Sequence, residues 1–77
     1  MMIMEHERVV LKSPIPDKGL EAGDVGTVVH VYRDGEAYEL EFVALDGHTA
    51  AIATVEASQV RPVAPGEIPH ARELVAA

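Results

Sequence analysis

The stretch that decides the fold is residues 24–43, which read DVGTVVHVYRDGEAYELEFV. Its first half is rich in β-branched residues, and Gly26 within it indicates a bend or bulge. Its second half alternates, so that Tyr38, Leu40 and Phe42 share one face of the expected strand. An Asp-Gly pair separates the two halves and is a strong hairpin signal. We therefore predict strands over residues 24–32 and 37–43, with the three apolar side chains in the core.

Shorter strand patterns flank this hairpin on both sides. Residues 8–12 precede it, and residues 49–55 and 60–63 follow it. A second Asp-Gly turn lies before the fourth strand, and residues 56–59 have room for only one 3₁₀ turn. Five strands in this order predict an all-β fold, specifically a five-stranded SH3-like barrel. An OB-fold has a similar strand number but needs a helix between its third and fourth strands, for which there is no room.

A long loop, residues 13–23, joins the first two strands. Its two prolines and two glycines exclude a regular strand or a long helix. We expect Ile15 and Leu20, which lie within this polar segment, to fold the loop onto the core.

We assign residues 1–63 to one barrel domain and residues 64–77 to a C-terminal tail. Breakers interrupt the first half of the tail, which is then frayed, docked on the barrel or available to a partner. From Pro69 onward the apolar residues follow helical spacing, and we predict a short helix whose apolar side contacts protein: Ala71, Leu74 and Val75.

Composition excludes several classes of protein. The 77 residues are 48% hydrophobic, which is too apolar for a disordered chain, and none is cysteine, so disulfides and thiolate metal sites are absent. Thirteen acidic residues against six basic ones give a net charge of −7, which argues against nucleic acid as the main partner. We find no signal-peptide pattern and no apolar run near the roughly 20 residues of a membrane span, and we expect a cytoplasmic protein.

Residues 19–29 and 34–43, together with Asp46-Gly47 and residues 58–62, resemble a family of small bacterial proteins. That family is catalogued as a domain of unknown function and carries the number 4926. The resemblance covers roughly residues 9–63 and implies an SH3-like fold without catalytic residues. Some members are encoded beside another small protein, which implies a toxin–antitoxin or immunity-type pair.

No residue pattern in the chain indicates an active site or a metal site. Glu39 and Glu41 lie on one strand face at a spacing found in catalytic carboxylate pairs, but a solvated strand face gives the same pattern far more often. The four histidines are 18 to 24 residues apart, without the spacing of metal ligands. We therefore predict a non-enzymatic protein with no cofactor and no bound metal.

These observations favour a protein-interaction module. An acidic surface suits a basic protein partner, and we predict a neutralising, antitoxin or immunity-type role towards a neighbouring small protein. Self-association, where it occurs, would use strand edges or the tail. The alternative is a KOW-like nucleic-acid or ribosome-associated domain. We predict that six residues bind the partner: Asp17, Glu21, Asp34, Glu36, Leu74 and Val75.

Overall fold

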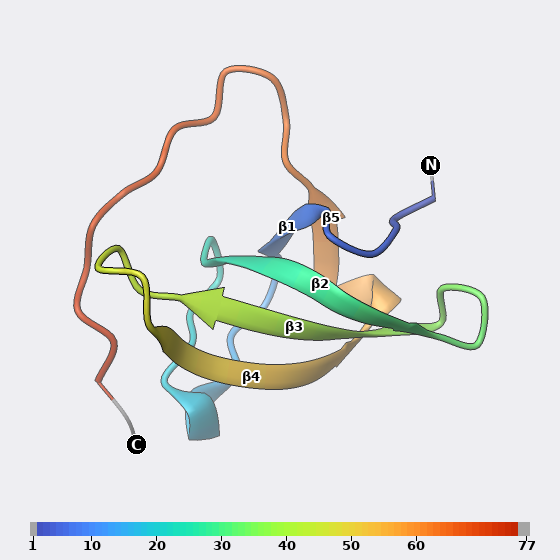
Figure 1. Cartoon of the computed structure of the whole chain (residues 1–77), viewed down its shortest axis with the longest axis horizontal. Helices are drawn as coiled ribbons and strands as arrows, with labels where there is room; N and C mark the ends of the chain where they lie inside the picture. Colours follow the sequence, from blue (N-terminus) through green and yellow to red (C-terminus); the bar gives the residue numbers. More distant parts are fainter. Residues whose placement is uncertain (1, 76–77) are drawn as a thin grey trace.

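The computed structural model describes residues 2–75 as one antiparallel sheet followed by an irregular tail (Figure 1). Its strands run in the order β4-β3-β2-β1-β5. The bounds of the strands and of two 3₁₀ turns are β1 Arg8–Leu11, η1 Pro16–Lys18, β2 Val25–Tyr32, β3 Ala37–Val43, β4 Thr49–Glu56, η2 Ala57–Gln59 and β5 Val60–Pro62. The predicted all-β class and all five strands are confirmed.

The sheet is open where a closed barrel was expected. Within residues 2–75, β4 and β5 form its two edges, and neither pairs with the other. The sheet instead curls around one apolar core, to which β1 and β5 contribute as well as β3 and β4. Edge strand β5 is only three residues long and ends at Pro62, whose missing N–H cannot extend a ladder.

The alternating strand β3 supplies the centre of the core, as predicted. Tyr38, Leu40 and Phe42 are each 5% exposed or less. Gly26 on β2 lies where the Phe42 ring packs, and a Cβ there would be 2.9 Å from Cε2 of that ring. The glycine in β2 therefore makes room for an aromatic ring.

A bulge in β2 lies at Val29, three residues beyond Gly26, the position expected from the sequence. The pairing with β3 shifts between Val28 and His30, so Val29 is an extra residue and turns outward. As a result Tyr32 faces the outer side of the sheet, where its ring lies edge-on to that of His30 at 4.4 Å. The bulge thereby reverses the face that strict alternation along β2 would give Tyr32.

Two chain segments outside the strands complete the core. Leu20 is buried and Ile15 packs against the core, as expected for the loop over residues 13–23. Ile3 is also buried, and the backbone just after it pairs with β2 through His6 N–H to Val28 O at 2.7 Å. Ile3 was not predicted, because nothing in the N-terminal pattern marks it as apolar core.

The tail, residues 63–75, forms no helix. In Figure 1 it leaves β5, makes a wide arc and returns to the side of the molecule where η1 lies. The helix predicted from Pro69 onward is wrong over the described residues. Two side chains spaced two apart in this irregular segment contact the rest of the protein: Arg72 and Leu74. Residues 2–75 include no helix long and apolar enough to cross a membrane.

Candidate functional site

The six residues predicted to bind a partner lie in three places. Asp34 and Glu36 belong to the turn between β2 and β3, and both are exposed. Asp17 is exposed within η1. Glu21, Leu74 and Val75 lie near one another, because the end of the tail docks on the loop that joins β1 to β2. The structure thus brings together half of the predicted set.

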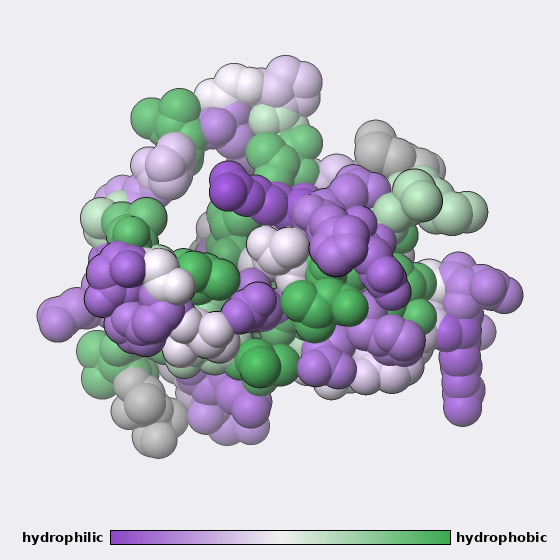
Figure 2. Space-filling model, in the orientation of Figure 1, coloured by the Kyte–Doolittle hydropathy of each residue, from purple (hydrophilic) through white to green (hydrophobic). Residues whose placement is uncertain are grey.

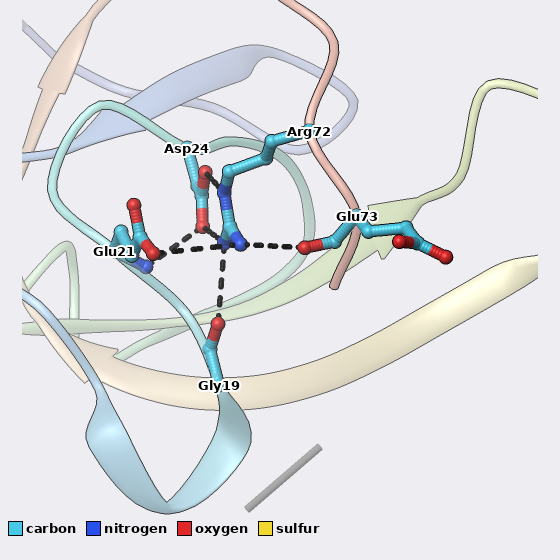
Figure 3. A network of polar contacts seen from close by, with 5 residues as sticks. All are labelled: Gly19, Glu21, Asp24, Arg72 and Glu73. Carbon is cyan, nitrogen blue, oxygen red and sulfur yellow. Dashed lines mark hydrogen bonds and ion pairs between the residues drawn. The ribbon is translucent and has the colours of Figure 1, made fainter. Parts of the chain in front are cut away.

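Arg72 is the centre of this docked region (Figure 3). Its guanidinium makes a two-pronged contact with the Asp24 carboxylate, of which the Nε to Oδ1 distance is 3.0 Å. It also donates to the Gly19 carbonyl oxygen at 3.2 Å, and its Nη1 lies 3.7 Å from the Glu21 carboxylate. The forked geometry of a guanidinium matches a carboxylate in this way, whereas a lysine would offer only a point charge.

The loop holds Asp24 in place through its own backbone. The Glu21 N–H donates to Asp24 Oδ2 at 2.8 Å, and the Leu11 N–H donates to the Asp24 carbonyl oxygen at 2.9 Å. Gly23, at a φ of 96°, donates to the Leu11 carbonyl oxygen at 2.8 Å. Glycine is suited to that left-handed backbone because it has no Cβ. The carboxylate is therefore positioned by β1 and the loop.

The electrostatics of the pair follow from this geometry. Burial raises the pKa of Asp24, but the hydrogen bonds from Arg72 and from the Glu21 N–H outweigh it, and the net pKa lies below its ordinary value. The hydrogen bond to Asp24 correspondingly raises the pKa of Arg72. Both groups are thus held in their charged forms.

An apolar contact lies beside the ion pair. Leu74 is half-buried against the core, while Val75 is 74% exposed. Gly19, at a φ of 71°, faces the Val75 carbonyl oxygen so closely that a Cβ would collide with it. A shallow open hollow continues from here, lined by Pro14, Pro16, Gly19, Leu20, Glu21, Arg72, Glu73 and Val75.

A second region of interest is the outer face of β2, β3 and β4. Glu39 and Glu41 point outward between the buried residues of β3. The Tyr32 hydroxyl donates to Glu39 Oε1 at 2.8 Å, which raises the pKa of Tyr32, and the Thr49 hydroxyl donates to Glu41. Within residues 2–75 neither carboxylate forms an ion pair.

Apolar side chains share the face of these two carboxylates, although Glu39 itself pairs with His30 on β2 and Thr54 on β4. Ile52 pairs directly opposite Glu41, and three side chains on this face are between 40% and 49% exposed: Val29, Val43 and Ile52. Figure 2 shows that apolar and charged side chains alternate over the visible surface and do not form one continuous apolar patch. We call Val29, Glu39, Glu41, Val43 and Ile52 the outer sheet face.

The histidines do not converge. All four are exposed, and His48 forms an ion-pair contact with Asp46 at 2.6 Å between Nδ1 and Oδ1. His30 lies 3.9 Å from Glu5 on the outer side of β2. In the part of the chain that the structure describes, no three His, Asp or Glu side chains are close enough to hold a metal ion.

A comparison with protein families gives one match, to the family described as "Domain of unknown function (DUF4926)", over residues 5–62. The match covers most of the chain. This protein belongs to the DUF4926 family. Searches of the curated proteins and of the solved structures each found no significant match. The DUF4926 match takes in all five strands and the loop that carries Asp24, whereas Arg72 and the rest of the tail lie outside it.

Two participants in the docked region were missed by sequence reasoning. Arg72 and Asp24 are 48 residues apart, and neither belongs to a local motif. The sequence pointed to Asp24 only indirectly. Asp24 directly follows a glycine at the start of the strand with the strongest pattern, where the loop geometry fixes the direction of the side chain. Arg72 carried no signal, because a single arginine in an irregular tail is ordinary.

Proposed function

We propose that this DUF4926 protein is a non-enzymatic, cytoplasmic binding module whose partner is a basic protein that docks on the outer sheet face. The observation that carries the proposal is the pair Glu39 and Glu41. Both carboxylates lie mid-sheet on the face that also carries Val29, Val43 and Ile52 and, within residues 2–75, they accept side-chain hydrogen bonds only from hydroxyl groups.

Such a surface suits a partner with lysine or arginine placed between apolar side chains. Complementary charge speeds the encounter and fixes the orientation, while burial of the apolar side chains slows dissociation. The net charge of −7 adds long-range attraction for a basic partner and repels nucleic acid. Neutralisation of a small basic protein is the use that these properties favour most.

Strand β4 adds a second attraction for the same partner. It is an eight-residue edge, and among residues 2–75 it pairs only with β3. An extended segment could add to such an edge through main-chain hydrogen bonds, with its side chains reaching Ile52 on the outer face.

The test begins with a photo-crosslinking amino acid in place of Ile52, used in the native host to capture and identify the partner. The affinity of that partner is then measured for Glu39→Gln/Glu41→Gln and for the matched control Asp34→Asn/Glu36→Gln, which removes the same charge from the β2–β3 turn. We expect the outer-face variant to bind at least about ten-fold more weakly, with a smaller salt dependence, and the turn variant to bind nearly as the native protein does.

Two results would contradict the proposal. One is a larger loss in the turn variant, which would place the partner on Asp34 and Glu36. The other is capture of RNA or DNA at position 52, with binding that weakens steeply as salt rises, which would favour the KOW-like alternative.

A further inference from the structure

The end of the tail occupies a site that the rest of the chain has already built. Asp24, Glu21 and the Gly19 carbonyl oxygen surround the Arg72 guanidinium, and the apolar wall beside them receives Leu74. All of these partners come from the loop between β1 and β2 and from the core, whereas the ligand groups come from the far end of the chain.

The site does not depend on the tail for its shape. Hydrogen bonds donated by the backbone N–H groups of Glu21 and Leu11 orient Asp24. A backbone bridge between Ile15 and Leu20 connects the two sides of the loop. With the tail displaced, the loop would present the Asp24 carboxylate, which is 19% exposed while Arg72 is docked on it, together with a second carboxylate and a carbonyl oxygen beside apolar side chains. That set of groups is chemically complementary to an arginine followed by an aliphatic residue.

The tail is attached in a way that allows it to leave. Residues 63–71 are exposed and without regular structure, and the polar anchor of their first part is local, between Arg61 and Glu67 at 2.7 Å. Beyond that turn, the tail is held to the rest of the protein through Arg72 and the half-buried Leu74. These contacts are few compared with the apolar core that holds the strands together, so opening of the tail costs far less than unfolding of the sheet.

We infer that the loop over residues 14–24 is a receptor for an extended segment of a partner protein that carries arginine with an aliphatic residue two positions later, and that the tail is its intramolecular occupant. The spacing is that of the observed occupant, in which Arg72 contacts Asp24 and Leu74 packs against the core. This inference does not rest on the outer sheet face.

The tethered tail would compete with any incoming segment. A short flexible linker gives its end an effective concentration of order mM, so a partner must bind well enough to displace it. Partner segments that bind this loop too weakly to displace the tail are therefore excluded from the site.

The test uses the full chain and a fluorescent octapeptide with the sequence of residues 68–75, IPHARELV. Arg72→Ala in the protein opens the site while leaving the receptor loop unchanged. We expect the peptide to bind this variant at least about ten-fold more tightly than the native chain, as measured by fluorescence anisotropy. Adding Asp24→Asn to the variant should abolish that binding, and so should alanine in place of the arginine of the peptide.

A second measurement needs no variant. In the native chain, millimolar unlabelled peptide should move the NMR signals of residues 71–75 to free-chain positions, while those of Gly19 and Asp24 keep bound-state positions. Equal peptide affinity for native and Arg72→Ala proteins, equal binding of the alanine peptide, or no displacement in the native chain would each overturn the inference. A concentration-dependent dimer of the native chain that Arg72→Ala abolishes would overturn it too, because a second copy would then be the occupant.

Discussion

The sheet and the tail of this protein are ordered by different forces. Every strand of the sheet buries apolar side chains, and Val9, Val28 and Leu40 are fully buried between paired strands. The tail buries only part of Leu74 and otherwise depends on charged contacts at two places, with Glu67 and with Asp24. The free energy gained from apolar burial changes little with salt and pH over ordinary ranges, whereas that gained from surface ion pairs changes with both.

The two regions are suited to different kinds of function. A surface that must keep its shape is best placed on the sheet, as with the outer sheet face. An element that must be displaced is best placed on the tail, which is held by few contacts.

Removal of the Phe42 ring should have the largest effect. Phe42→Ala leaves a cavity between β2 and β3 and should lower the free energy of unfolding by about 3–5 kcal/mol, which is comparable with the whole stability of so small a domain. Ile52→Ala, on the exposed side of β4, is the control and should cost less than about 1 kcal/mol. Chemical denaturation measures both. Similar losses in the two variants would mean that the core is misassigned.

Gly26→Ala should have the next largest effect. The added Cβ would lie 2.9 Å from the Phe42 ring, so the ring or the strand must shift, at a cost of about 1–3 kcal/mol. Phe42→Leu removes the ring, and in that background the cost of Gly26→Ala should become smaller. A cost that is the same in both backgrounds would show that the glycine serves the backbone and not the ring.

Leu74→Ala tests the apolar anchor of the tail. A half-buried leucine contributes about 1 kcal/mol, roughly half the value of a fully buried one, and the variant should lose that amount. Val75→Ala is the matched control, because Val75 is 74% exposed, and should leave the melting temperature unchanged. Equal melting temperatures for the native protein and Leu74→Ala would show that the tail does not stabilise the protein through Leu74 in solution.

The smallest effect is a local change with pH at the start of the tail. The hydrogen bonds from Arg61 lower the pKa of Glu67 from its ordinary value of 4.5 to about 2. Because the folded pKa is the lower one, the contact stabilises the turn above pH 4.5, and this contribution is lost as the pH falls from 4.5 towards 2. An NMR titration of the Glu67 carboxyl carbon should show the low midpoint, and Arg61→Ala should return it towards 4.5. An unchanged midpoint in that variant would refute the assigned cause.

The strands were predictable because each carries a local signal. The alternation of β3 and the two Asp-Gly turns placed the sheet elements within a residue or two of their observed bounds. The bulge at Val29 was not predictable, because it depends on how β2 meets β3 and reverses the facing of Tyr32. The openness of the sheet likewise depends on contacts between strands far apart in the chain.

The docked tail illustrates the same limit more strongly. Ala71, Leu74 and Val75 fit helical spacing, but eight residues make a marginal helix, and a long-range contact decides the outcome. Arg72 reaches Asp24 across 48 residues, and Leu74, two positions later, packs against the core in the non-helical tail. Half of the predicted partner-binding residues proved to be neighbours, although the arginine that organises them carried no sequence signal.

The most direct test of the contrast between sheet and tail is the ¹⁵N–¹H heteronuclear NOE of every backbone amide, measured on the native chain and on Arg72→Ala at neutral pH and low salt. We predict that residues 71–75 are as ordered as the strands in the native chain, that they become mobile in the variant, and that the values for β1 to β5 are the same in both. Tail residues that are equally mobile in the native chain, or strands that loosen together with the tail, would contradict the account.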